Sequence, residues 1–311
     1  MNDTAVHVVL GAGPAGTAIA AELAGRGLRV RHVDRRAIPA AADGIETVQA
    51  DLSTPEATIA ATEGATTIYH AVNVAYHLQV DLLPGIGESI IAAAREHRAK
   101  LVVLDTLYPY GTADGDAITE ATAWNATSRK GRLRADLDRR YLEAHAAGDV
   151  RVALGRAADF FGPGVVLSTL GGAFFPGALT GEPAVGFGDL DLPHSYSFIK
   201  DVARGLAILG TDERAEGRVW HLPTNPALST SQVHHLVAEL TGRPVNVHLL
   251  EEPRAYGPFD EQFMAEYAEM FYQHQIPQNM VSTDFERTFG VHPTPMREAL
   301  AQTVDWYAQA A

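Results

Sequence analysis

The first half of the chain alternates short hydrophobic runs with longer amphipathic segments. Runs such as Val6–Leu10 consist of β-branched and aliphatic residues, which is typical of strands buried on both faces of a parallel sheet. The segments between them carry apolar residues at helical spacing and predict helices that cover the sheet. This rhythm predicts an α/β fold of the Rossmann type, a doubly wound parallel sheet with right-handed crossovers.

The rhythm changes near residue 155. Strands are expected at 6–10, 28–33, 46–50, 66–72, 100–104, 150–154 and 217–222, with helices at 17–27, 55–63, 83–96, 132–147 and 200–209. Residues 162–196 are rich in glycine and proline and predict loops. The chain from Ser229 onward is predicted to be mainly helical.

The first strand ends in a glycine-rich turn. Gly11, Gly13 and Gly16 have the spacing G-x-G-x-x-G directly before a helix, and this spacing lets the backbone approach a pyrophosphate. Pro14 fits the first helical turn, where its missing N–H costs nothing, and Ala15 separates it from the last glycine. Free N–H groups and the positive end of the helix dipole would hold the phosphates. We therefore expect a dinucleotide-binding site here.

An acidic residue at the end of the second strand sharpens this expectation. Asp34 lies close to the distance at which the dinucleotide fingerprint places the acid that binds the adenosine ribose hydroxyls, and it favours NAD as the cofactor. Arg35 and Arg36 follow directly and could meet a 2′-phosphate, so NADP stays open. Ligands bind such sheets at the carboxyl ends of the strands. These ends carry Gly11, Asp34, Asp51, Asn73 and Thr106.

Composition narrows the range of partners. The chain has 311 residues, a net charge of −14 and no cysteine. The charge argues against nucleic acid or an anionic membrane as a partner, and the lack of cysteine excludes disulfides and thiolate chemistry. No run is long and apolar enough to span a membrane and the N-terminus has no secretory pattern, so a cytoplasmic protein is expected. His234 and His235 have no partner at ligand spacing, so we expect no metal.

Further motifs resemble those of one family in their order and spacing. After the glycine loop come Asp51-Leu52, Thr106–Gly111, Arg156–Gly164, Ser197–Ala203 and the segment 289–307. Together they resemble the extended short-chain dehydrogenase/reductases, the NAD-dependent epimerase/dehydratase group, over nearly the whole chain. The resemblance implies NAD(P)-dependent hydride transfer on a small hydroxy or carbonyl metabolite, with Asp51 and Leu52 beside the adenine. Members commonly dimerise through two long helices, so the resemblance leaves a homodimer open.

The resemblance also implies catalytic roles. Family members use a serine or threonine to hold the reacting oxygen, a tyrosine to exchange its proton, and a lysine four residues later. That lysine binds the nicotinamide ribose and lowers the tyrosine pKa. Thr106 fits the first role and Lys130 the last, but Ala126 stands where the tyrosine is expected and can transfer no proton. Arg129 and Arg132 beside the lysine are interpreted as surface charges.

Three hypotheses follow from the alanine at position 126. In the first, Tyr108 replaces the missing tyrosine, because the position two before Tyr110 faces the reacting group in relatives. In the second, Lys130 or a bound water moves the proton. In the third, the protein is a catalytically silent dinucleotide-binding or redox-sensing module. The sequence leaves all three open.

Two more departures concern the substrate. Asp159 occupies the place of the family's substrate-contacting asparagine, and His194 that of an arginine that can hold a diphosphate in sugar-nucleotide enzymes. Because histidine lacks the forked phosphate donor and a carboxylate repels anions, we expect an uncharged or basic small-molecule substrate. The expected organisation is an NAD(P)-binding domain of residues 1–160, to which 197–225 return. Residues 161–196 and 226–311 are expected to form a smaller, mainly helical substrate-binding region.

Overall fold

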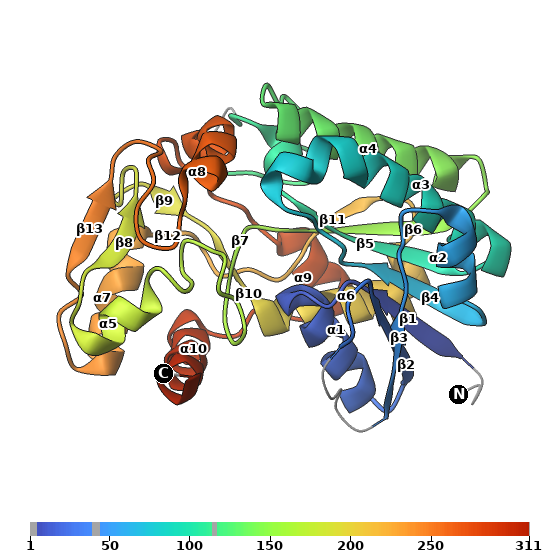
Figure 1. The fold of residues 1–311 in the computed structure, drawn as a ribbon, viewed down its shortest axis with the longest axis horizontal. Coiled ribbons are helices and arrows are strands. Elements are labelled where there is room, and N and C mark those ends of the chain that lie inside the picture. Colours follow the sequence, from blue (N-terminus) through green and yellow to red (C-terminus); the bar gives the residue numbers. More distant parts are fainter. Residues whose placement is uncertain (1–4, 39–43, 114–116, 311) are drawn as a thin grey trace.

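A seven-stranded parallel sheet forms the centre of the molecule (Figure 1). The structure, a computed structural model, describes residues 5–38, 44–113 and 117–310. The strand order is β11-β6-β5-β4-β1-β2-β3, and neighbouring strands are all parallel. The strands are β1 (Val6–Leu10), β2 (Arg29–Asp34), β3 (Ile45–Gln49), β4 (Ala65–His70), β5 (Lys100–Thr106), β6 (Arg151–Ala157) and β11 (Val219–His221). The chain order reverses between β1 and β4, which confirms the predicted doubly wound fold.

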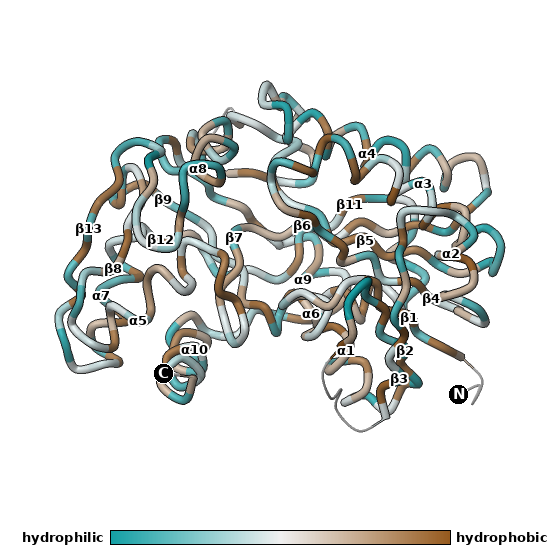
Figure 2. Tube along the Cα trace, viewed as in Figure 1, coloured by the Kyte–Doolittle hydropathy of each residue, from teal (hydrophilic) through white to brown (hydrophobic). Residues whose placement is uncertain are grey.

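Helices cover both faces of this sheet. One face carries α1 (Pro14–Gly25) and α6 (Ile199–Thr211), and the other carries α2 (Pro55–Ala61), α3 (Gln79–His97) and α4 (Arg129–Ala146) (Figure 1). Each face has its own buried core: Leu23 of α1 belongs to one and Ile90 of α3 to the other. In Figure 2 the hydrophobic colour is concentrated along the central strands, as expected for a sheet buried on both faces.

The start of α4 differs from the prediction by one helical turn. The sequence pattern predicts a helix from residue 132, whereas α4 begins at Arg129. Ser128 is the N-cap, and its hydroxyl accepts a hydrogen bond from the Gly131 backbone N–H at 3.0 Å. This cap places Lys130 inside the first turn, with its side chain buried.

The C-terminal part packs beside the carboxyl edge of the sheet (Figure 1). Its helices are α5 (Phe175–Thr180), α7 (Thr230–Thr241), α8 (Glu261–Tyr267) and α10 (Met296–Ala310), whereas α9 (Thr283–Phe289) packs on the sheet face that carries α6. Its strands are β7 (Asp159–Phe161), β8 (Ala184–Phe187), β9 (Pro193–His194), β10 (Tyr196–Phe198), β12 (Leu228–Ser229) and β13 (Val247–Leu250). The 3-10 helices of the chain are η1 (Tyr76–Leu78), η2 (Tyr108–Tyr110), η3 (Glu213–Ala215) and η4 (Ala268–His274).

Residues 162–196 contain more regular structure than predicted. A short helix, α5, and two strands, β8 and β9, interrupt the expected loops. Strand β8 pairs with β13, which is distant in the sequence, so neither strand shows the pattern of a local hairpin. Short elements of this kind owe their conformation to partners that a local pattern cannot reveal.

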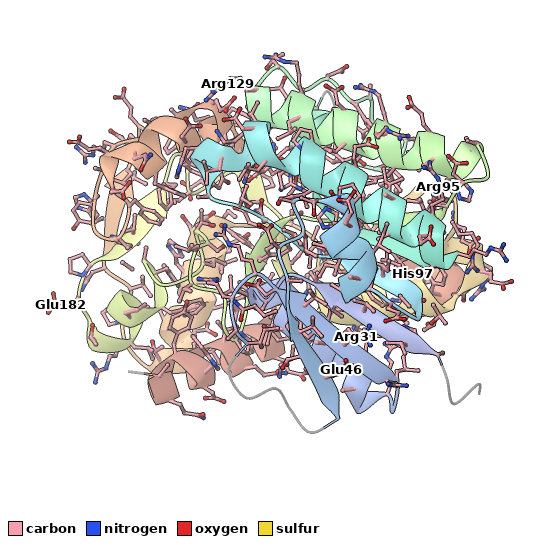
Figure 3. All side chains as sticks on the ribbon, turned by 45° about the vertical axis from the view of Figure 1, so that its right-hand side comes forward. Arg31, Glu46, Arg95, His97, Arg129 and Glu182 are labelled. Carbon is pink, nitrogen blue, oxygen red and sulfur yellow. The ribbon has the colours of Figure 1, made fainter. Side chains whose placement is uncertain are left out.

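Ion pairs tie neighbouring elements together at the surface. Arg31 of β2 lies 3.1 Å from Glu46 of β3, and Figure 3 shows the two residues at the same edge of the sheet. The Glu46 side chain is exposed, and a pair with one solvent-exposed partner contributes little stability, about 1 kcal/mol. Within the described ranges, no helix is both long and apolar enough to cross a membrane.

Candidate functional site

The glycine loop between β1 and α1 is shaped by close backbone contacts. Gly11 has a φ of +98°, and a Cβ there would lie 2.8 Å from the Ala71 carbonyl oxygen. A Cβ on Gly16 would lie 1.8 Å from the Gly11 carbonyl oxygen, so α1 packs too closely for any side chain. A Cβ on Gly13, in contrast, would meet open space. The first and last glycines therefore build the turn, and the middle one leaves room for a ligand.

A buried histidine of β2 forms a hydrogen bond to this loop. His32 of β2 places its Nε2 2.9 Å from the Gly11 carbonyl oxygen. Burial lowers the pKa of His32, so the neutral ring donates Nε2–H to that oxygen near pH 7. The sequence prediction missed this residue, although its place two before Asp34 puts both side chains on the same face of β2.

Asp34 connects β2 to the glycine loop. Its Oδ2 accepts the Ala12 backbone N–H at 2.8 Å, and its Oδ1 accepts the Arg36 N–H at 2.9 Å. Each carboxylate oxygen keeps a further lone pair for a ribose hydroxyl. No side chain in the described part of the chain caps the N-terminus of α1. A cradle with an open middle glycine, an uncapped helix end and this carboxylate fits a dinucleotide.

The other residues expected near the adenosine half differ in exposure. Leu52 is buried in the core below the sheet edge, whereas Asp51 is exposed and accepts the Ser53 N–H at 3.0 Å. Arg35 and Arg36 are exposed. Asp51 and the two arginines can therefore reach a ligand only from the solvent side, and their contacts to the cofactor stay predictions.

Two tyrosine hydroxyls meet beyond the carboxyl end of β5. The Tyr108 hydroxyl lies 2.6 Å from that of Tyr76 in η1. Thr106, the last residue of β5, accepts the Tyr108 backbone N–H at 3.3 Å. Burial raises the pKa of Tyr108 well above its usual value, and the neighbouring Tyr76 and Asp159 raise it further. The phenol is therefore protonated at neutral pH.

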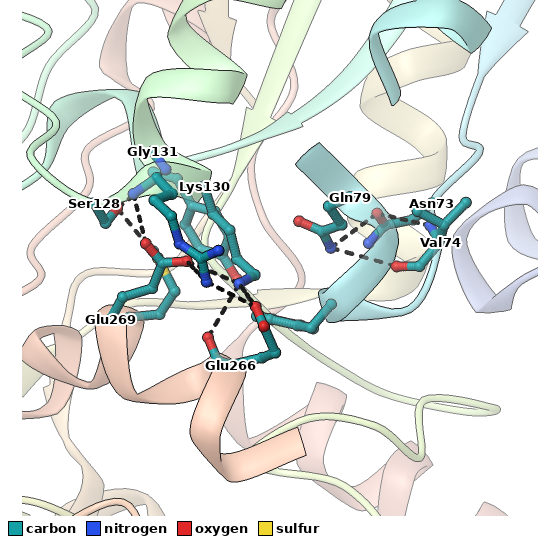
Figure 4. A network of polar contacts seen from close by, with 12 residues as sticks. Asn73, Val74, Gln79, Ser128, Lys130, Gly131, Glu266 and Glu269 are labelled. Atoms are coloured by element: carbon teal, nitrogen blue, oxygen red, sulfur yellow. Dashed lines mark hydrogen bonds and ion pairs between the residues drawn. The ribbon is translucent and has the colours of Figure 1, made fainter. Parts of the chain in front are cut away.

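Lys130 points toward the C-terminal part and is held by an acidic clamp, defined as Glu266 and Glu269. Its Nζ donates to Glu266 Oε2 at 2.5 Å, to Glu269 Oε1 at 2.8 Å and to the Glu266 carbonyl at 3.1 Å (Figure 4). The side chain is 0% exposed. Arg129, at the exposed start of α4 in Figure 3, pairs with both glutamates as well. All three ammonium hydrogens of Lys130 are used in these bonds. The contact of Lys130 to a cofactor ribose therefore stays a prediction.

One helical turn after Lys130 lies a second buried cation. Arg134 is 7% exposed, and its Nη2 donates to Asn73 Oδ1 at 3.0 Å. Asn73 follows β4 and is exposed at the carboxyl edge of the sheet. The sequence prediction missed Arg134, because its burial depends on the contact to Asn73 after β4, which the pattern of α4 alone does not reveal.

The predicted substrate residues lie together. His194 Nε2 lies 3.2 Å from Asp159 Oδ2, and the Thr169 hydroxyl donates to the same oxygen at 3.3 Å. Burial alone would raise the pKa of Asp159, but the hydrogen bond and charge of His194 outweigh it and lower the pKa. Asp159 is thus a carboxylate that orients the His194 imidazole.

Two residues that the sequence prediction missed extend this pair. The Tyr267 hydroxyl lies 2.6 Å from His274 Nε2, and the His274 ring stacks on that of His194 at 5.5 Å between centroids. Burial lowers the pKa of His274 to about 4, so this ring is neutral near pH 7. Asp159, His194, His274 and Tyr267 form the polar cluster, a name used below for these four residues. They come from distant segments without motif spacing, so no local pattern could have joined them.

A buried arginine fixes the strands beneath the site. Arg156 of β6 donates from Nε to Asp105 at 3.0 Å and from Nη2 to Asp138 of α4 at 2.5 Å. Its guanidinium also lies 4.3 Å from the Trp124 ring centroid. Because Asp105 precedes Thr106, this network sets both the end of β5 and the position of α4. No cluster of His, Asp and Glu in the described ranges is arranged to hold a metal ion.

Comparisons with known proteins agree with the fold. A model of the NAD dependent epimerase/dehydratase family matches residues 7–222. Among solved structures, MoeE5 in complex with UDP-glucuronic acid and NAD has a TM-score of 0.78 at 21% identity, covering 98% of this chain and 99% of that chain. A search of curated proteins finds no match.

Two further solved structures show the same likeness. The dTDP-glucose 4,6-dehydratase from Bacillus anthracis, in complex with NAD, has a TM-score of 0.80 at 15% identity, with coverages of 98% and 97%. The UDP-glucose 4-epimerase from Thermus thermophilus, also complexed with NAD, has a TM-score of 0.77 at 20% identity, with coverages of 98% and 100%. At these identities the similarity shows the fold.

Proposed function

Because the chain belongs to the NAD-dependent epimerase/dehydratase family, we propose that it is an enzyme that transfers a hydride between NAD and a small hydroxy or carbonyl compound. The family is NAD-dependent, which confirms NAD as the expected cofactor. The observation that carries the proposal is the tyrosine pair of Tyr108 and Tyr76. It lies beyond β5, on the side of the sheet crevice opposite to Asp34.

Two groups of residues at the carboxyl edge of the sheet would hold the two halves of the cofactor. When bound, NAD supplies the carbon that accepts or returns the hydride. The glycine loop and the α1 N-terminus would hold the pyrophosphate, and Asp34 the adenosine ribose hydroxyls. Asn73, at the end of β4, would border the nicotinamide half.

We assign the proton transfer to Tyr108 in place of a tyrosine at position 126. The Thr106 hydroxyl would hold the reacting oxygen, and the protonated Tyr108 would donate its proton to that oxygen as a carbonyl is reduced. The Tyr76 hydroxyl at 2.6 Å could then donate a hydrogen bond to the Tyr108 phenolate. Lys130 would act next to this pair by holding α8 and η4 against α4, with its Nζ 5.3 Å from the Tyr76 ring centroid and its charge neutralised by Glu266 and Glu269.

The polar cluster supports a hydroxylated, uncharged or basic substrate. Asp159 and His194 would accept and donate hydrogen bonds to its hydroxyl groups. The three structures named above are a dTDP-glucose dehydratase, a UDP-glucose epimerase and a protein complexed with UDP-glucuronic acid. A diphosphate beside Asp159 would face a carboxylate rather than a forked cation, so we propose a substrate without one.

A second candidate function is that of a silent NAD-binding or redox-sensing protein. It is favoured by the acidic clamp, which engages the hydrogens of Lys130, and by Ala126, which can transfer no proton. In that case the crevice binds NAD, but no residue on α4 completes a proton path.

Turnover separates the two functions. The protein would be mixed with NAD or NADH and a panel of small sugars, alcohols, aldehydes and ketones, and the absorbance of reduced cofactor followed. We expect turnover by the wild type, a loss of about a hundredfold in Tyr108→Phe, and wild-type activity in the control Tyr272→Phe. Unchanged activity in Tyr108→Phe would contradict the assignment, and NAD binding without any turnover would favour the silent module.

A further inference from the structure

Among the described residues, the charge of Arg134 has no partner of opposite sign. It is 7% exposed, and none of the carboxylates in the described ranges lies within ion-pair distance of it. Within the described part of the chain, its guanidinium makes one hydrogen bond, to Asn73 Oδ1, and its Nε is buried without a partner. Burying an arginine in this way is costly unless something else completes its hydrogen bonds.

A hydrogen-bond acceptor near Arg134, the Gln79 side-chain oxygen, also lacks a partner among the described residues. Gln79 is 1% exposed and donates from Nε2 to the same Asn73 Oδ1 at 3.2 Å, while its Oε1 is buried without a hydrogen bond (Figure 4). The unpaired Arg134 Nε–H donor and the unpaired Gln79 Oε1 acceptor thus belong to two residues that both contact the exposed Asn73 amide. A hydroxyl group can satisfy both, because it accepts from a guanidinium and donates to an amide oxygen.

The strand order indicates which hydroxyls these are. Asp34 ends β2 on one side of β1, and Asn73 follows β4 on the other side. A dinucleotide with its adenosine at Asp34 and its pyrophosphate on the glycine loop must continue toward β4 and β5. Its second ribose would then lie near Asn73, which both Arg134 and Gln79 contact.

Lys130 does not compete for this role. Lys130 lies one helical turn before Arg134, and its three hydrogen bonds all go to Glu266 and Glu269 of the C-terminal part. Of the two buried cations on this face of α4, the described residues neutralise only Lys130.

We propose that Arg134, together with Gln79, binds the nicotinamide ribose hydroxyls of NAD, and that Lys130 instead fastens the C-terminal part to α4. The assignment rests on the proposed function in that it takes NAD as the ligand. Arg134 acts as a binding and positioning residue that orients the nicotinamide end toward Thr106 and Tyr108. A forked guanidinium suits a ribose diol, since it can donate two parallel hydrogen bonds.

The test compares NAD with ADP, which shares the adenosine and the two phosphates of NAD but lacks the nicotinamide riboside. NAD and ADP would be titrated by calorimetry into the wild type, Arg134→Met and the control Arg139→Met, whose side chain is exposed on the same helix. We expect Arg134→Met to weaken NAD binding at least about tenfold and to leave ADP binding within about twofold. Arg134→Lys should retain part of the NAD affinity, and Arg139→Met should bind both ligands as the wild type does.

Two results would overturn the inference while the proposed function stands. Either NAD affinity is unchanged in Arg134→Met, or NAD and ADP weaken equally, which would place the arginine at the pyrophosphate. If Arg134→Met does not fold, as judged by circular dichroism, Gln79→Met provides the same comparison with a smaller expected loss. Failure of the proposed function is recognised separately, because the wild type would then either bind neither ligand or bind NAD without any turnover, whatever the affinities of Arg134→Met.

Discussion

Replacing Lys130 by methionine tests the strongest ionic contact between α4 and the C-terminal part. The substitution keeps the length and apolar stem of the side chain but removes the ammonium from Glu266 and Glu269. Removing one partner of a fully buried pair costs about 3–5 kcal/mol, whereas exposed pairs contribute about 0–1 kcal/mol. Here the lysine is 0% exposed and the glutamates are 25% and 19% exposed. Arg129 remains near both, so we expect a loss of about 2 kcal/mol.

The same contact predicts how this loss depends on pH. The hydrogen bond from Lys130 lowers the pKa of Glu266 below its usual 4.5. Burial raises the pKa of Glu269, but its bonds to Lys130 and Arg129 outweigh this and lower it overall. A carboxylate with a lowered pKa stabilises the fold above its usual pKa, and this contribution is lost as the pH falls through the folded value. The difference between wild type and Lys130→Met should therefore narrow below about pH 4.5.

Urea unfolding at pH 7 and in acid measures both effects. Lys200→Met, which changes an exposed lysine, is the control. Hydrogen exchange should also show faster exchange in α8 and η4 of Lys130→Met, because the clamp holds these elements on α4. A difference below about 0.5 kcal/mol at pH 7, or one that does not narrow in acid, would refute this account of the clamp.

Two further predictions concern the cofactor cradle and the polar cluster. Gly16→Ala should weaken NAD binding at least about tenfold in calorimetry, because its Cβ would lie 1.8 Å from the Gly11 carbonyl oxygen, whereas Gly25→Ala meets nothing within 4 Å and should bind normally. Equal affinities in these two variants would contradict the geometry of the loop. Burial lowers the pKa of His274 to about 4, so the unfolded chain binds a proton here before the folded one and stability falls as the pH drops from about 6.5 to 4. His274→Gln should lose less stability over that interval in urea unfolding, and a loss as large as that of the wild type would argue against a buried neutral ring.

The sequence predicted the parts of the site that depend on local pattern. The sheet, the glycine loop and Asp34 follow from hydrophobic runs, glycine spacing and the distance to the next strand end. Asp159 and His194 were predicted from motif positions to contact one substrate, and the structure brings them within 3.2 Å.

The parts that could not be predicted depend on contacts between distant segments. Nothing near Lys130 in the sequence indicates that Glu266 and Glu269 surround it, because those residues reach α4 only when the C-terminal part folds beside it. Arg134 was missed for the same reason, because its burial depends on a contact to Asn73 after β4, which the pattern of α4 alone does not reveal.

The most direct test of the central claim is a calorimetric titration of the wild-type protein with NAD and with NADP. The account places the adenosine ribose at Asp34, whose carboxylate accepts hydrogen bonds from hydroxyls but repels a 2′-phosphate. It therefore predicts saturable NAD binding at one site per chain, with NADP bound more weakly. Tighter binding of NADP would contradict the role of Asp34, and binding of neither would contradict the proposed function as a whole.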